Sequence, residues 1–170
     1  MFSFLSGLYF RGKLTYARAF ENPPSEVIPG VHIITPSDGL CLPELMVTLE
    51  DLQAFADVAI DVDEAAYRMP LERDAAELAD KLEPDCELVL LGSVATGKYV
   101  DILLPILGER LLFPQEFLGR GDMARGGMML KSAAARVELT YIPVSDPSRL
   151  EVRPRKPTQA NTVRRVEGTP

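Results

Sequence analysis

Residues 87–99 read Glu-Leu-Val-Leu-Leu-Gly-Ser-Val-Ala-Thr-Gly-Lys-Tyr, and this stretch decides the fold class. Its apolar run, 88–91, indicates a strand that is covered on both faces. A small, hydroxyl-rich turn follows, and helical spacing of apolar residues continues from Thr96 to Leu107. A strand that runs through a glycine-containing turn into a helix indicates an α/β protein, and the helix N-terminus offers unpaired N–H groups to an anion.

The flanking sequence extends this pattern in both directions. Thr48 and Asp51 form a variant capping box at the start of one helix, and Pro70 suits the first turn of another. Further helices are expected over 11–20, 48–58 and 70–82, and further strands over 31–35, 110–113 and 137–144. Strands separated by helices predict one three-layer α/β domain over 1–145, with a parallel or mixed sheet of about four strands and helices on both faces.

Composition sets limits on the class of protein. A hydrophobic content of 46% in 170 residues is enough for one core, whereas residues 146–170 lack periodicity and predict a disordered, mildly basic tail. The first residues lack a basic n-region, and no run approaches the ~18 apolar residues of a membrane span. A cytoplasmic protein without a membrane partner is therefore expected, and the sequence leaves its oligomeric state open.

Charge is unevenly distributed along the chain, which has a net charge of −7. Residues 50–87 hold thirteen Asp and Glu against three Lys and Arg, whereas residues 98–136 hold six Lys and Arg against four acids. This pattern suits a small anionic or nucleoside-like ligand, or one exposed nucleotide of a single strand, better than a long duplex. Two distant cysteines and a single histidine do not indicate a metal site, and no metal or other cofactor is expected.

The turn after the 88–91 strand fits the P-loop spacing G-x-x-x-x-G-K. Tyr99, however, stands where a P-loop has the Ser or Thr that coordinates Mg²⁺, so a P-loop nucleotide-binding protein is the less favoured reading. The residues expected to bind a phosphate, ribose or base are Gly92, Ser93, Thr96, Gly97 and Lys98. The competing interpretation is a tight strand-to-helix turn with Thr96 as its N-cap.

Two further segments carry candidate site residues. In 120–127, flanking glycines would let a ligand approach the backbone, and Arg120 and Arg125 suit bidentate binding of an anion. Asp122 would orient an arginine or act as a general base, unless it is a helix cap. Asp38 follows the 31–35 strand, at the end where open α/β sheets bind ligands, although Pro-Ser-Asp-Gly is also an ordinary turn.

Four blocks of sequence resemble a known family. They are Leu8-Tyr9-Phe10-Arg11 with Tyr16-Ala17, Ile34-Thr35-Pro36 to Gly39-Leu40 with Pro43-Glu44-Leu45, Leu90-Leu91-Gly92 to Tyr99, and Phe113-Pro114 with Gly119-Arg120-Gly121. Together they resemble an uncharacterised bacterial α/β family that is distantly similar to YaaA-like proteins and to the uracil-DNA-glycosylase-like domain of archaeosine synthase.

The resemblance implies a pocket at strand ends that binds a nucleobase, a nucleoside or an exposed nucleotide. The chain departs from YaaA-like proteins because it lacks a cysteine- or lysine-rich first strand. It departs from the glycosylases because no His-containing loop stands opposite a catalytic Asp. Binding or base modification is therefore the expectation that carries over, rather than glycosylase chemistry.

The sequence thus predicts a protein that binds, or binds and modifies, a nucleoside-like or phosphate-bearing ligand at strand ends. Lys98, Arg120 and Arg125 would hold the anion, while Asp38 or Asp122 would move a proton. The alternative is a non-catalytic interaction or accessory module in which the glycines serve turns only. Convergence of the three cations on one cavity would favour the enzyme, and their dispersal would favour the module.

Overall fold

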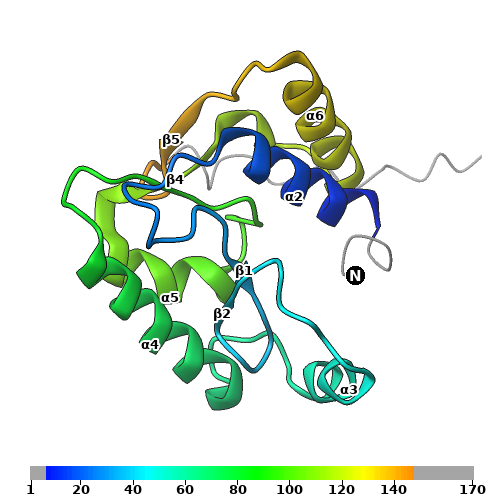
Figure 1. Ribbon diagram of the computed structural model, residues 1–170, viewed down its shortest axis with the longest axis vertical. Coiled ribbons are helices and arrows are strands. Elements are labelled where there is room, and N and C mark those ends of the chain that lie inside the picture. Colours follow the sequence, from blue (N-terminus) through cyan, green and yellow to red (C-terminus); the bar gives the residue numbers. More distant parts are fainter. Residues whose placement is uncertain (1–6, 148–170) are drawn as a thin grey trace, which may run out of the picture.

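The computed structural model describes residues 7–147 and shows a mixture of helices and short strands (Figure 1). The helices are α2 (Leu8–Phe20), α3 (Leu49–Asp57), α4 (Ala65–Lys81), α5 (Gly97–Leu107) and α6 (Asp122–Ala135), with 3-10 turns η1 (Gly108–Arg110) and η2 (Gln115–Phe117). The strands are β1 (Ile33–Ile34), β2 (Leu40–Cys41), β3 (Leu88–Val89), β4 (Leu111–Pro114) and β5 (Tyr141–Pro143). The α/β class is confirmed, and the expected tail lies outside the described residues apart from its first two.

The strands form two small sheets, and the expected single sheet of about four strands in three layers is not confirmed. In the three-stranded sheet, β3 pairs with β4 in parallel and β4 pairs with β5 antiparallel. The segment 31–35 does not join it, because β1 pairs with β2 in a separate antiparallel hairpin. Within the described residues, one edge of β3 therefore has no strand partner.

A tight turn explains why β1 folds back on β2. The Thr35 N–H donates to the Gly39 carbonyl at 2.9 Å, and Gly39 adopts a φ of 66°, which an L side chain rarely tolerates. The Leu40 N–H then donates to the Asp74 carboxylate of α4 at 2.9 Å. The hairpin is thus attached to α4 and not to the edge of β3.

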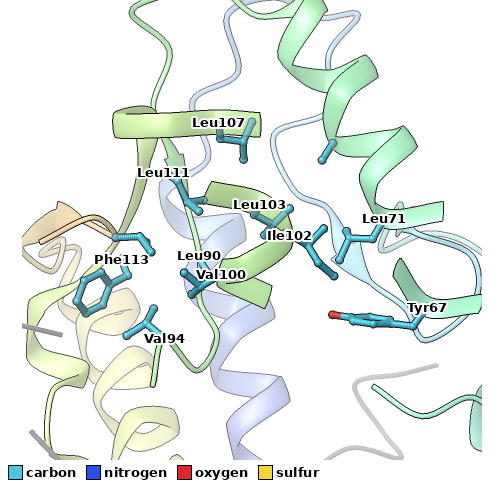
Figure 2. Close-up of a cluster of buried hydrophobic side chains, with 12 residues drawn as sticks. Tyr67, Leu71, Leu90, Val94, Val100, Ile102, Leu103, Leu107, Leu111 and Phe113 are labelled. Atoms are coloured by element: carbon cyan, nitrogen blue, oxygen red, sulfur yellow. The ribbon is translucent and has the colours of Figure 1, made fainter. Parts of the chain in front are cut away.

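The main core lies between the three-stranded sheet, α5 and α4 (Figure 2). Leu90, Leu111 and Phe113 contribute from the strand side, and they are met by a row of apolar side chains on α5. That row consists of Val100, Ile102, Leu103 and Leu107. Tyr67 and Leu71 of α4, both fully buried, close the other side of the cluster. This packing holds the first turn of α5 in a fixed place at the end of β3.

Helices α2 and α6 form a second packed unit, side by side in the upper part of Figure 1. Two glycines allow their backbones to touch: a Cβ on Gly12 would lie 2.7 Å from the Gly126 carbonyl oxygen, and a Cβ on Gly126 would lie 2.9 Å from the Tyr9 Cα. A small buried cluster next to this contact consists of Tyr16 of α2, Phe117 of η2 and Met129 of α6. The close approach places the first turns of α2 and α6 against each other.

The helix ends follow local signals except at α4. Thr48 and Asp51 make the expected reciprocal capping box at α3, and Gly108 ends α5 with a φ of 58°. Helix α4, however, begins at Ala65, where the Glu64 side chain accepts a hydrogen bond from the Ala66 N–H. Pro70 therefore lies inside the helix rather than in its first turn, where it removes one backbone hydrogen bond.

Candidate functional site

The turn between β3 and α5 is held firmly from two sides. Gly92 is buried, and a Cβ there would lie 3.3 Å from the Tyr99 ring, so the ring rests directly on the turn. The Tyr67 hydroxyl donates to the Lys98 carbonyl at 2.9 Å, which fixes the first helical turn from α4. Burial raises the pKa of Tyr67, so this donor stays protonated. Thr96 occupies the N-cap position but makes no side-chain capping bond.

Two lysines from different helices meet beside this turn. Lys13 of α2 lies over the aromatic rings of Tyr9 and Phe10, with its Nζ 4.8 Å and 5.6 Å from their centroids. Burial lowers the pKa of Lys13; the Asp122 carboxylate acts in the opposite direction, and the charge of Lys98 lowers it further. The Nζ of Lys98 lies 5.0 Å from the Tyr99 ring centroid.

A cavity of about 1070 Å³ opens beneath α2. Phe10 and Lys13 line it from α2, the edge of β3 lines it along its length, and Gly92 and Tyr99 lie where the strand ends. His32 and the rest of the 28–34 segment form the opposite wall. Burial lowers the pKa of His32, which therefore faces the cavity as a neutral ring at pH 7. The cavity thus follows the unpaired edge of β3.

A chain of hydroxyl groups lines another part of this cavity. The hydroxyls of Tyr16 and Tyr141 are 2.6 Å apart, and the Tyr141 hydroxyl donates to the Glu138 carboxylate at 2.9 Å. The Tyr16 hydroxyl also accepts the Leu139 N–H at 2.8 Å. Burial, followed by the bonds to Tyr16 and Glu138, raises the pKa of Tyr141. These bonds tie α2 to the approach of β5 and leave both phenols protonated.

Arg125 is largely occupied by contacts within the protein itself. Its Nε and Nη2 donate to the Phe117 carbonyl at 3.2 Å and 3.0 Å, its guanidinium lies 5.4 Å from the Phe117 ring centroid, and only 12% of its side chain is exposed. The remaining nitrogen pairs with Asp122 at 3.7 Å. Burial raises the pKa of Tyr9, and Arg125 acts against this, so Arg125 and the Tyr9 hydroxyl are neighbours.

The structure separates the other predicted site residues. Arg120 is exposed and lines a different, shallow depression of about 420 Å³ on α6, together with Met123 and Lys131. Asp38 lies in the tip of the β1–β2 hairpin, where its N–H donates to the Thr35 hydroxyl at 3.0 Å and its carboxylate accepts from Ser37. It is not among the described residues that line the large cavity.

The predicted residues therefore divide into two groups. Gly92 lines the large cavity, whereas Lys98, Asp122 and Arg125 are not among the described residues that line it, although the charges of Lys98 and Asp122 influence the pKa of Lys13 in its wall. Gly97 and the half-buried Ser93 belong to the same turn, and Thr96 is exposed at its outer side. Asp122 is the first residue of α6, so the alternative that it is an N-cap is wrong, because Gly121 holds that position. Convergence of Lys98, Arg120 and Arg125 on one cavity is not observed.

Sequence reasoning missed the residues of α2. Lys13, Tyr9 and Tyr16 face the site only because α2 packs on α6, and nothing in their local sequence marks this. The available signal was the block Leu8 to Ala17, quoted above for its resemblance to a family and not for its chemistry. Tyr99 was considered only as a replacement for a metal-binding hydroxyl, whereas its ring is a wall of the cavity.

Comparisons and wider searches add little to this geometry. No protein-family model matches the chain, and no curated protein or solved structure is significantly similar to it. Between residues 7 and 147, no three or more His, Cys, Asp and Glu side chains are grouped so that they could hold a metal ion. Over the same range, no helix combines the length and apolar character needed to cross a membrane.

Proposed function

We propose that the chain binds a nucleoside-like or phosphate-bearing ligand in the cavity beneath α2, with the anionic group of the ligand between Lys13 and Lys98. One observation carries the proposal. Lys13 of α2 lines the cavity together with Gly92 and Tyr99 of the turn that opens α5, and the charge of Lys98 in that first helical turn contributes to the lowered pKa of Lys13. A cytoplasmic location, expected from the sequence, agrees with such a ligand.

The electrostatics of this corner favour an anion. Lys13 makes no ion pair within 4.0 Å inside the described chain, and Asp122, whose carboxylate raises the pKa of Lys13, is itself paired with Arg125 at 3.7 Å. The first N–H groups of α5 have no partner within the helix and add a positive dipole end. Like charges held together in a half-buried place destabilise the empty protein, and a bound phosphate or carboxylate would relieve this.

The walls of the cavity favour a ring. Phe10, Tyr99 and the neutral His32 present flat side chains, and the β3 edge supplies apolar area. Aromatic rings stack on nucleobases with a gain of about 1–3 kcal/mol per base. Ligand sites are in general concave and mostly apolar with a few polar groups that fix orientation, which is the composition found here.

Modification of the ligand is a separate step beyond binding. Of the two predicted acid or base residues, Asp122 lies with the lysines, whereas Asp38 is engaged in the hairpin turn. We therefore propose Asp122 as the group that would move a proton, with Lys13 and Lys98 stabilising the negative charge. The geometry supports binding more directly than it supports catalysis.

Binding is tested by calorimetry and thermal shift with named probes. The probes are inorganic phosphate, AMP, GMP, CMP, UMP and the four matching nucleosides, and we expect at least one monophosphate to bind more tightly than its nucleoside. Lys98→Met should weaken that binding by roughly tenfold to a hundredfold, as expected when a charged hydrogen bond of about 1.5–3 kcal/mol is lost. The control Lys131→Met removes an exposed lysine on the outer side of α6 and should leave affinity unchanged.

The alternative, a non-catalytic interaction module, is favoured by the dispersal of Lys98, Arg120 and Arg125, which do not converge on one cavity. A second observation also favours it. Helix α3 buries none of its residues, and Leu45, Met46 and Leu49 are 49%, 80% and 71% exposed near its start. Arg120, just before α6, is likewise exposed and lines a shallow depression with Met123. If none of the probes binds, and Lys98→Met and Lys131→Met behave alike, this module is the better description.

A further inference from the structure

The charges that line the large cavity are very unequal. Among the described residues, Lys13 is the one Lys or Arg in its wall, and five carboxylate residues accompany it. These five are Glu21, Glu83, Asp85, Glu87 and Glu138. Three of them lie in the stretch 83–87, which precedes β3, whereas Gly92 follows the strand. The acids of 83–87 therefore lie toward the beginning of β3, whereas Glu138 precedes β5, whose first residue Tyr141 pairs with Pro114 at the carboxyl end of β4.

The described part of the chain as a whole is also negatively charged. Residues 7–147 hold 23 of the 25 Asp and Glu but only 12 of the 18 Lys and Arg. Of the cavity acids, Glu21 is paired with Arg18 at 3.2 Å, and Asp85 and Glu87 have no ion pair within 4.0 Å inside the described part of the chain. Their charge is therefore largely uncompensated, and it is felt over about 10 Å at 0.1 M salt.

A ligand with several phosphates would meet these charges unfavourably. Its first phosphate would lie at Lys13 and Lys98, but a second or third would extend toward carboxylates or over an acidic surface. Proteins that bind nucleic acid chains do the opposite, because they follow the backbone with Lys and Arg. Like charges placed opposite each other at a binding surface cost several kcal/mol and suppress wrong partners.

From this asymmetry we infer that the cavity takes a ligand of mononucleotide size with a single anionic group, and that its acidic lining excludes nucleic acid chains. The inference rests on the proposed function, because it concerns the ligand of the same site. It assigns a role to Glu83, Asp85 and Glu87, namely selection against polyanions. The single-stranded nucleic acid considered from the sequence is thereby removed as the ligand of this cavity.

The test compares ligands that differ in phosphate number alone. Whichever of AMP, GMP, CMP and UMP binds best is measured by calorimetry at 50 mM and 150 mM salt beside the 5′-phosphorylated dinucleotide and hexanucleotide of the same base. We expect the hexanucleotide to bind at least tenfold more weakly than the monophosphate. The triple variant Glu83→Gln, Asp85→Asn, Glu87→Gln should reduce this difference several-fold and leave monophosphate affinity nearly unchanged.

A matched control separates local from general charge. Glu50→Gln, Asp57→Asn, Asp80→Asn removes the same number of exposed carboxylates from α3 and α4, away from the cavity, and should not alter the discrimination. A hexanucleotide that binds wild type as tightly as the monophosphate would overturn the inference alone. An equal gain in hexanucleotide affinity in both triple variants would also overturn it, since the discrimination would then come from the net charge of the protein. If no monophosphate binds at all, the proposed function fails, and the inference fails with it.

Discussion

Gly12 of α2 lies against Gly126 of α6 so closely that a Cβ on Gly12 would meet the Gly126 carbonyl oxygen at 2.7 Å and its Cα at 2.9 Å. Real Cβ atoms do not approach backbone at these distances, so both positions require glycine. One helical turn in α2 carries Gly12 together with Tyr9 and Lys13, and the same contact therefore positions Lys13 beside Asp122. The glycine pair sets the geometry of the candidate site.

Replacing Gly12 with alanine should destabilise the protein despite the better helix propensity of alanine. Propensity would contribute about 1 kcal/mol, but overpacking against a rigid backbone costs about 1–3 kcal/mol and separates the helices. We expect a net loss of up to about 2 kcal/mol in chemical denaturation, with weaker monophosphate binding in the same variant. The control is Gly127→Ala, where a Cβ meets nothing within 4 Å. It should stabilise by about 0.5–1 kcal/mol, and two equally destabilised variants would contradict the contact.

Replacing Lys13 with methionine should raise stability while it removes anion binding. Burial and the nearby Lys98 lower the pKa of Lys13 in the folded protein, so its charge is unfavourable in the folded state. Between that lowered pKa and the unfolded value of 10.5, the unfolded chain binds the extra proton, so wild-type stability rises with pH. The advantage of the variant should be largest below this window and shrink through it, as measured by denaturation at pH 7 and above.

The predicted gain for Lys13→Met is roughly 2 °C in Tm, near the lower end of what about 1 kcal/mol produces in a domain of this size. Lys131→Met serves as the reference, since Lys131 is exposed on α6. A destabilised Lys13→Met protein at pH 7 would show that the lysine is a structural group with a favourable partner, and the proposed anion site would lose its main support.

The two tyrosines of the hydroxyl chain should differ in their contribution to stability. Tyr16→Phe leaves the Leu139 N–H without its acceptor, so we expect a loss of about 1–2 kcal/mol, within the range for an unsatisfied group. Tyr141→Phe removes a bond to an exposed carboxylate and one to Tyr16, and should cost about 1 kcal/mol or less. The double variant should lose less than the sum, because the two hydroxyls share one bond. Strict additivity would speak against that bond.

Substitution of Arg125 should lower the stability of the protein much more than substitution of Arg120. Arg125→Ala removes two donors from the Phe117 carbonyl and should cost about 1.5–3 kcal/mol in urea denaturation. Arg125→Lys should recover only part, because an ammonium cannot supply the two-pronged geometry. Arg120→Ala, at an exposed position, should stay within about 0.5 kcal/mol and leave monophosphate binding unchanged. A large effect at Arg120 would mean that the outer side of α6 belongs to the site.

Local signals in the sequence predicted the elements better than the way in which they associate. The Thr48–Asp51 capping box and the strand-to-helix turn before Lys98 depend on neighbours in the chain, and both formed as expected. The pairing of 31–35 depends on whether a tight turn at Gly39 and a bond from Leu40 to Asp74 outweigh an alignment with β3. Residue spacing contains no information on that balance.

The candidate site shows the same division. Gly92 and Lys98 were identifiable because a turn and a helix start are encoded locally. Lys13 was not, because its position follows from the contact between two glycines more than a hundred residues apart in the chain, and its neighbours in α2 give no hint of this. Arg120 and Arg125 looked equivalent in the sequence, yet Arg120 is exposed before α6 begins, whereas Arg125 in its first turn is bonded to the Phe117 carbonyl.

The unpaired edge of β3 has a consequence for the behaviour of the protein in concentrated solution. Residues 88–91 are four consecutive apolar residues, and within the part of the chain that the structure describes one edge of β3 is free, which is the kind of segment from which intermolecular sheets grow. In the folded chain, α2 lies over the cavity along this edge and keeps other molecules away from it. Any change that loosens α2 from α6 would therefore expose a template for aggregation, and the glycine contact protects solubility as well as the site.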